Sequence, residues 1–186
     1  PTTLYGAALA ESTIAFEPDP LAFDELEYNL KANADAPWVK RIDAKHVAVG
    51  TKDGTIRIGS RGDGGDSMTS ALWADEDNSW KVKSLDFKRW MEQNISADRR
   101  IFCKMDIEGF EYDLLPSLKD TFKRKKPVLY LSLHPELLME SFLRGRRGIA
   151  SNIIARWNLF RTHRNILRTL ASAKLEYTNG RLFRPR

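Results

Sequence analysis

Residues Ile101–Leu115, with the sequence IFCKMDIEGFEYDLL, decide the fold of this chain. The segment 101–105 is apolar except at its fourth position and too short for a helix, so it predicts a buried parallel strand that ends at Asp106. A turn should follow at Gly109. Beyond it the spacing predicts a helix with three side chains facing inward: Tyr112, Leu114 and Leu115.

The two acidic residues after this strand, Asp106 and Glu108, mark a candidate site. Side chains alternate along an extended chain, so both carboxylates should point to the same side. In an open α/β sheet, ligands bind at the edge formed by the carboxyl ends of the strands. Acidic residues at this position also suit the N-terminus of the next helix, where they would act as caps.

Three segments, taken in order, resemble a known family. Met105–Leu115 resembles the D-x-E-G-x-E-x-x-x-L signature of FkbM-type S-adenosylmethionine-dependent methyltransferases. Ala15–Pro20 (AFEPDP) is similar to the second-strand motif of that family, and Leu131–Pro135 (LSLHP) is similar to the end of its fifth strand. The resemblance extends from about Pro1 to Pro135 and implies a methyl-transfer activity.

The alternation of predicted strands and helices indicates the fold class. It predicts one α/β domain over residues 1–186, built as a three-layer sandwich. The resemblance implies the Rossmann-like methyltransferase version, a mostly parallel sheet with one antiparallel strand near its end. Family members carry a first strand and a glycine-rich turn, and this chain begins with residues like those that follow them. We therefore expect a domain that is incomplete at its N-terminus, with two unpaired strand edges through which a homo-oligomer would form.

The N-terminal half predicts several further elements. Strands are expected at Ser12–Phe16, at 46–49 and at Trp80–Ser84. Asp53-Gly54 is a hairpin signal that should return the chain antiparallel through Thr55–Ile58. A helix over 85–91 should follow, with Ser84 as its cap.

The C-terminal half predicts a strand, two helices and a hairpin. Pro127–Leu133 reads as an apolar strand, and a helix follows from Pro135. A long amphipathic helix should begin at Asn152 and bury one face, which holds Ile153, Trp157, Phe160, Leu167 and Leu170. Asn179-Gly180 predicts a terminal hairpin.

The candidate cofactor site follows from the resemblance. The carboxylate of Glu17 ends a strand and can accept both hydroxyls of a ribose; the matching residue in the family holds the ribose of S-adenosylmethionine. Asp19 belongs to the same motif, and Asp106 should lie nearest the transferred methyl group. Ala48 and Val49, at the end of the next strand, would flank the adenine. A solvated acid at the end of a strand is the simpler alternative for Glu17.

Three titratable residues are candidates for catalysis: Asp106, Glu108 and His134. Methyl transfer from a sulfonium needs alignment and a base for the acceptor proton, and the ordinary pKa of histidine suits a base near neutral pH. A structural role for His134 is the alternative. Oxygen and nitrogen ligands of this kind suit several divalent ions, but no histidine or cysteine cluster supports a metal, so we predict none. Ser67, Thr69 and Ser70 are possible contacts for the acceptor or the cofactor.

Composition and charge bound the remaining interpretations. The chain has 186 residues, is 42% hydrophobic and has one cysteine, Cys103, which predicts a buried inert thiol and a cytoplasmic protein. The net charge of +5 is unevenly distributed: residues 1–122 hold 15 basic and 22 acidic residues, and 123–186 hold 15 and 3. The resemblance implies the first hypothesis, an O-methyltransferase for a hydroxyl of a sugar or secondary metabolite. The alternative is a non-catalytic module with a basic C-terminal face for anionic ligands. Neither nucleic acid nor a membrane is favoured as a partner.

Overall fold

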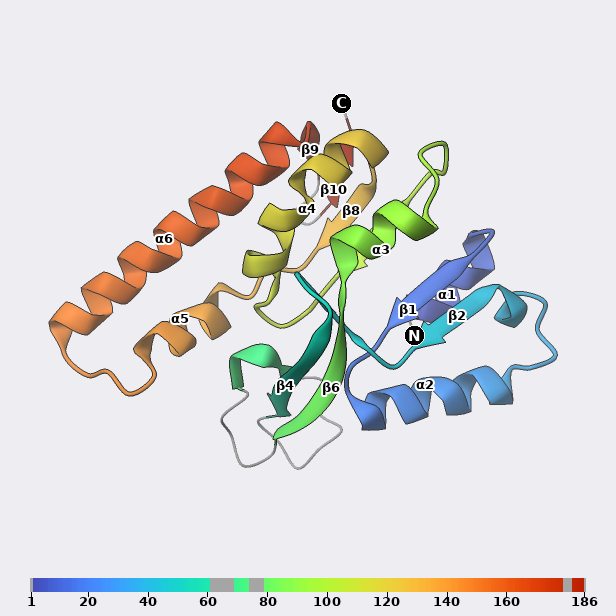
Figure 1. The fold of residues 1–186 in the computed structure, drawn as a ribbon, viewed down its shortest axis with the longest axis horizontal. Helices are drawn as coiled ribbons and strands as arrows, with labels where there is room; N and C mark the ends of the chain where they lie inside the picture. The colour runs from blue at the N-terminus through green and yellow to red at the C-terminus, as the bar shows by residue number, and fades with distance from the viewer. Residues whose placement is uncertain (1, 61–68, 74–78, 179–181, 186) are drawn as a thin grey trace. The chain divides into compact units, whose positions relative to one another are not determined.

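The computed structural model describes residues 2–60, 69–73, 79–178 and 182–185 (Figure 1). Its internal contacts divide the chain into two compact units. The first unit comprises residues 1–69 and 73–85, and the second comprises 70–72 and 86–186. None of the helices in these described ranges is long and apolar enough to cross a membrane. That residues 1–186 form a single domain stays a prediction.

The first unit begins with a β-α-β arrangement. β1 (Thr13–Phe16) pairs in parallel with β2 (Ile42–Lys45), and α2 (Pro20–Ala32) connects them. The predicted first strand and the helix behind it are thus confirmed. The unit also contains helix α1 (Thr2–Leu9) and the short 3-10 helix η1 (Val39–Arg41). A four-stranded sheet has the order β3-β6-β4-β5, in which β5 is the short strand Thr69–Ser70.

The strand predicted at 46–49 is wrong in position. The chain pairs with β1 through Ile42–Lys45, and the apolar residues that follow split between a connection and β3 (Ala48–Gly50), which belongs to the other sheet. A small two-stranded sheet is half-exposed, so its second strand alternates polar and apolar residues. The continuous apolar run that signals a fully buried strand is absent there.

The hairpin predicted at Asp53-Gly54 is also wrong. β4 (Gly54–Ser60) does not pair with β3. Its antiparallel partner is β6 (Ser79–Asp86), which lies between them in the sheet. The turn signal is local, whereas β4 pairs with residues 20 to 30 positions further along the chain, from Gly59↔Ser79 to Gly54↔Ser84.

The strand predicted at Trp80–Ser84 is confirmed within β6, but the helix after it begins later. α3 (Phe87–Asn94) starts two residues beyond the expected position. Its cap is the carboxylate of Asp86, which accepts a hydrogen bond of 3.0 Å from Arg89 N. Ser84 is not the cap, since its hydroxyl donates to Lys52 O at 3.1 Å.

The second unit is built on a four-stranded sheet in the order β7-β8-β10-β9. β7 (Phe102–Met105) and β8 (Val128–Leu131) are parallel and are joined by α4 (Glu111–Lys125). β9 and β10 pair antiparallel, as the predicted C-terminal hairpin requires, and β10 is also antiparallel to β8. Asn179 and Gly180, where the turn was predicted, lie outside the described residues. The remaining elements are η2 (Ala71–Trp73), α3, α5 (Pro135–Leu143), α6 (Ile149–Ser172), β9 (Leu175–Thr178) and β10 (Leu182–Pro185).

The core of the second unit lies along α4. Leu114, Leu115, Leu118 and Phe122 are fully buried, and α4 packs against both α3 and α6. Two parallel β-α-β units, one in each half of the chain, confirm the predicted α/β class of Rossmann-like type. Within the described ranges β1 is bonded only to β2, and β7 only to β8.

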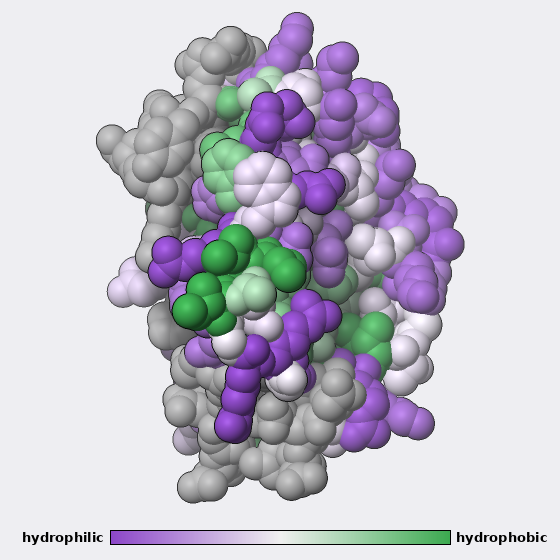
Figure 2. All heavy atoms as spheres, turned by 90° about the vertical axis from the view of Figure 1, so that its left-hand side faces the viewer, coloured by the Kyte–Doolittle hydropathy of each residue, from purple (hydrophilic) through white to green (hydrophobic). Residues whose placement is uncertain are grey.

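Helix α6 buries a different face from the one predicted. Ala155, Ile166, Thr169 and Leu170 are buried, whereas Trp157 and Phe160 are 60% and 56% exposed. Of the five residues expected on the buried face, only Leu170 lies there. The others belong to an exposed apolar set, and Figure 2, the side where α6 lies, shows hydrophobic residues at the surface bordered by hydrophilic ones.

Two phenylalanine variants test this placement. Phe122→Ala should lower the free energy of unfolding by about 3–5 kcal/mol, because it empties a fully buried site. Phe160→Ala should change it by less than about 0.5 kcal/mol, as expected for a largely exposed side chain. Urea denaturation of both variants measures the difference. Equal losses would contradict the packing of α6.

Candidate functional site

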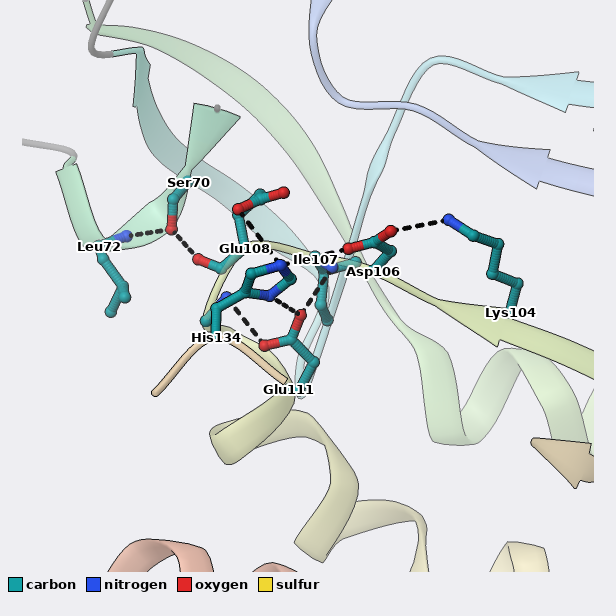
Figure 3. A network of polar contacts seen from close by, with 9 residues as sticks. Ser70, Leu72, Lys104, Asp106, Ile107, Glu108, Glu111 and His134 are labelled. Atoms are coloured by element: carbon teal, nitrogen blue, oxygen red, sulfur yellow. Dashed lines mark hydrogen bonds and ion pairs between the residues drawn. The ribbon is translucent and has the colours of Figure 1, made fainter. Parts of the chain in front are cut away.

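The candidate site of the second unit lies where β7 and β8 end. Met105 is opposite Leu131 in the parallel register, so the two strands stop at the same level. Asp106 directly follows the first strand, and His134 lies three residues beyond the second, at the start of α5. Figure 3 shows the side chains that converge there.

The turn between β7 and α4 has an unusual backbone. Glu108 has φ 51° and Gly109 has φ 95°, both in the left-handed region. The φ of Gly109 favours glycine, and a Cβ atom there would lie 2.6 Å from Leu72 Cδ1, so a substitution would also have to move the end of that side chain. Ser70, which is buried, holds the turn from outside, because its hydroxyl donates to Glu108 O at 2.6 Å.

Glu111, the first residue of α4, holds the turn through hydrogen bonds from the turn's backbone N–H groups to its side chain. Its side chain is fully buried. Oε1 accepts a hydrogen bond from Ile107 N and Oε2 accepts one from Gly109 N, both at 2.8 Å. The carboxylate therefore accepts from two backbone donors of the turn that precedes the helix. Its pKa is raised by burial, and the hydrogen bond from Ile107 opposes this rise.

His134 lies among three carboxylates. Its Nδ1 is 3.2 Å from Oε1 of the buried Glu111, and a carboxylate only accepts, so Nδ1 is the donor. Its Nε2 faces the opposite way, 3.5 Å from Asp106 Oδ1 and 3.7 Å from Glu108 Oε2 (Figure 3). The imidazole is thus fixed by one buried acid and presents its second nitrogen to two partly exposed ones.

The charges around His134 are predominantly negative. Burial raises the pKa of Glu108; His134 opposes the rise, while the carboxylates of Asp106, Glu111 and Glu136 add to it. The Lys104 ammonium lies 2.9 Å from Asp106 Oδ2, on the side away from His134. This arrangement can hold a proton, a hydroxyl group or a cation.

The three residues predicted for catalysis, Asp106, Glu108 and His134, are brought together by the structure. Their catalytic roles stay a prediction. The contacts of Glu111 with the turn and with His134 were not predicted from the sequence, although Glu111 occupies the second glutamate position of the signature that carried the resemblance. The hydroxyl of Ser70 bonds the backbone of the turn, and Ser67 lies outside the described residues.

The predicted cofactor residues Glu17 and Asp19 lie in the first unit, after β1. Glu17 Oε1 accepts from Asp19 N at 2.9 Å, and burial raises the pKa of Glu17, opposed by that hydrogen bond. Asp19 is buried and caps α2, since Oδ1 accepts from Leu21 N at 2.8 Å and Ala22 N at 3.3 Å. Asp19 therefore has a structural role in forming the helix.

The residue expected beside adenine, Ala48, does not end the strand next to β1. It begins β3 and is buried. The chain after β2 instead presents His46, whose ring stacks on Phe23 of α2 with centroids 4.8 Å apart. Because the sequence predicted the strand next to β1 at 46–49, it did not indicate that His46 stacks on Phe23.

Cys103 lies in β7, two residues before the turn, and is free. Burial raises the pKa of its thiol to about 12. A thiolate is the nucleophilic form of cysteine. Cys103 therefore stays an uncharged thiol near neutral pH, in agreement with the expected inert role.

The chain was compared with known proteins. Residues 4–174 match the family model described as the methyltransferase FkbM domain. A comparison with curated proteins gives no match. Among solved structures the chain is similar to the crystal structure of a methyltransferase FkbM from Methylobacillus flagellatus KT, with 21% identity and a TM-score of 0.44. The match covers 64% of this chain and 25% of that chain.

Glu111 provides the test of how the site is held. Glu111→Ala leaves two buried backbone donors without an acceptor, which should lower the free energy of unfolding by about 2–4 kcal/mol. Asp113→Ala is the matched control, an exposed acid in the same first turn, and should cost less than about 1 kcal/mol. Denaturant unfolding measures both. If the two variants were equally stable, the turn would not depend on Glu111.

Proposed function

Because the chain belongs to the FkbM methyltransferase family, we propose that it serves S-adenosylmethionine-dependent O-methylation, with a hydroxyl of a sugar or secondary metabolite as acceptor. The observation that carries the proposal is the convergence of Asp106, Glu108 and His134 at the ends of two parallel strands. Ligands bind at such an edge in α/β folds.

Methyl transfer from a sulfonium requires little covalent chemistry from the protein. The acceptor oxygen attacks the methyl carbon, the bond from carbon to sulfur breaks, and the sulfur leaves as a neutral thioether. The hydroxyl proton must leave the acceptor oxygen. Asp106, Glu108 and His134 supply groups that can orient the hydroxyl and hold that proton, and alignment supplies much of the rate.

Glu17 is proposed to hold the cofactor. Glu17 directly follows β1, and its carboxylate can accept hydrogen bonds from both ribose hydroxyls. One of its oxygens already accepts from Asp19 N, which fixes the side chain at the end of the strand. We assign Asp106 to the reacting end of the cofactor, and we propose a cytoplasmic location. A homo-oligomer would form through the edges of β1 and β7.

Two substitutions separate these roles. Glu17→Ala removes charge-assisted hydrogen bonds worth about 1.5–3 kcal/mol each, so affinity for S-adenosylhomocysteine should fall at least tenfold. Asp106→Asn should lower turnover much more than cofactor affinity. Calorimetry and a methyl-transfer assay measure these effects, and Glu25→Ala on the exposed side of α2 is the control. Full turnover by Asp106→Asn would place the reaction elsewhere.

A second candidate function is favoured by one observation on α6. Trp157 and Phe160 are exposed and stack on each other with centroids 5.9 Å apart. Arg156 and Arg161 adjoin them in the sequence and are exposed, and α6 contains no acidic residue. Aromatic and basic side chains together bind polyanions. We therefore propose that this basic face of α6, namely Arg156, Arg161, Arg164 and Arg168, is available to an anionic polymer.

Salt dependence tests the second candidate. Binding to heparin should weaken steeply as salt rises, because bound counterions are released. The double variant Arg161→Glu with Arg164→Glu should reduce affinity at least tenfold while the melting temperature changes little. An equal change of charge elsewhere, Lys40→Glu with Lys119→Glu, should have a much smaller effect. Heparin binding that is insensitive to salt and to the arginine variants would remove this candidate.

A further inference from the structure

We propose that Asp106, Glu108 and His134 form a binding site for a divalent cation of the first transition row, such as Mn²⁺ or Zn²⁺. Each residue offers one ligand atom, and these atoms all lie within 4.8 Å of one another. The three residues come from the turn after β7 and from the residue preceding α5. The proposal concerns metal binding and is independent of methyl transfer.

The first argument is the orientation of the imidazole. Because Nδ1 donates to the buried carboxylate of Glu111, the proton of a neutral His134 is on that nitrogen. The lone pair of Nε2 is then directed toward Asp106 and Glu108 (Figure 3). The lone pair of Nε2 and the two carboxylates repel one another. A cation placed between them would be attracted to all three groups and could bind His134, Asp106 and Glu108 as ligands.

The second argument is distance. The separations of 3.5 and 3.7 Å from Nε2 are longer than the 2.7–3.2 Å range of a good hydrogen bond. A metal about 2.1 Å from each ligand needs ligand atoms roughly 3.0–3.4 Å apart. The two separations from Nε2 exceed this range by a few tenths of an ångström, and the three ligand atoms lie within 4.8 Å of one another, so the carboxylates would turn inward to close on a cation.

The third argument is charge. Three carboxylates, those of Asp106, Glu108 and Glu111, surround one imidazole, and Glu136 adds to the negative potential at Glu108. Lys104 is the cation that contacts this cluster within the described residues, and it pairs with the outer oxygen of Asp106. The inner oxygens therefore face His134 with a net negative charge that a divalent cation would neutralise.

The supporting shell has the form found around bound metals. A histidine ligand commonly donates its other nitrogen to a carboxylate, which fixes its orientation and raises its basicity. Glu111 has this place here, and its own oxygens are held by Ile107 N and Gly109 N. Ser70 holds the carbonyl of Glu108. Two of the three ligands are thus anchored through the same turn.

The ligand set selects the class of cation. One imidazole with two carboxylates suits Mn²⁺, Fe²⁺ or Zn²⁺ better than Ca²⁺ or Mg²⁺, which prefer oxygen alone. Three protein ligands also leave coordination positions for water or a hydroxyl oxygen. A cation held there would lower the pKa of a bound hydroxyl. The importance of this effect for methyl transfer rests on the proposed function, whereas the binding of the metal does not.

The experiment is calorimetric titration of the chelator-treated chain with ZnCl₂, MnCl₂, MgCl₂ and CaCl₂ in turn, without cofactor or acceptor. We expect one site, with Zn²⁺ bound more tightly than Mn²⁺ and Mn²⁺ more tightly than Mg²⁺. His134→Ala should reduce Zn²⁺ affinity by at least 100-fold, and Glu108→Gln by at least tenfold. In His134→Ala the buried carboxylate of Glu111 keeps both of its backbone donors, so the variant should stay folded, which circular dichroism checks.

Two matched controls complete the test. His163→Ala removes a histidine that packs on Tyr112, and Asp113→Asn removes an exposed acid of α4. Neither should change Zn²⁺ affinity. The proposal is overturned if the folded wild-type chain takes up neither Zn²⁺ nor Mn²⁺, if His134→Ala binds Zn²⁺ as tightly as the wild type, or if Ca²⁺ binds as tightly as Zn²⁺.

Discussion

The candidate site depends on one buried carboxylate. Glu111 accepts the backbone donors of Ile107 and Gly109 and receives Nδ1 of His134, so it connects a turn, a helix and a neighbouring strand end. An uncompensated charge in this position would be strongly unfavourable. Each of its oxygens has a backbone partner, and the imidazole adds a third contact. The positions of Asp106, Glu108 and His134 relative to one another therefore follow from how Glu111 is satisfied.

The turn that carries two of these residues is held against its own conformational preference. A left-handed conformation costs a residue such as Glu108 of order 1 kcal/mol or more. Burial of Leu114, Leu115 and Leu118 along α4 offsets that cost, because the packed helix fixes the end of the turn. Strain of this kind persists only where the surroundings determine it. Here those surroundings are the core of the second unit and the hydroxyl of Ser70.

The sequence predicted those parts of the fold in which one segment specifies its own structure. The apolar strand before Asp106, the helix after Gly109 and the hairpin near the C-terminus all have local signals, and the three predicted site residues meet. Pairing partners were less predictable. The Asp-Gly turn before β4 does not indicate that β4 pairs with β6. The alternation of apolar and polar residues in β2 extends over only four residues, which is too short to identify the strand. The role of Glu111 required the structure, because a glutamate at a helix start is ordinarily a solvated cap.

Helix α6 shows why the amphipathic pattern alone did not identify the buried face. The helix has large apolar side chains on one side and small or polar ones, Ala155 and Thr169, among its buried positions. Periodicity measures where apolar residues recur, not how close the neighbouring helix lies. Because α4 and α5 pack against α6, small side chains suit the side of closest approach. Trp157 and Phe160 are then left at the surface beside arginines, so the same packing that completes the core of the second unit also creates its exposed aromatic and basic face.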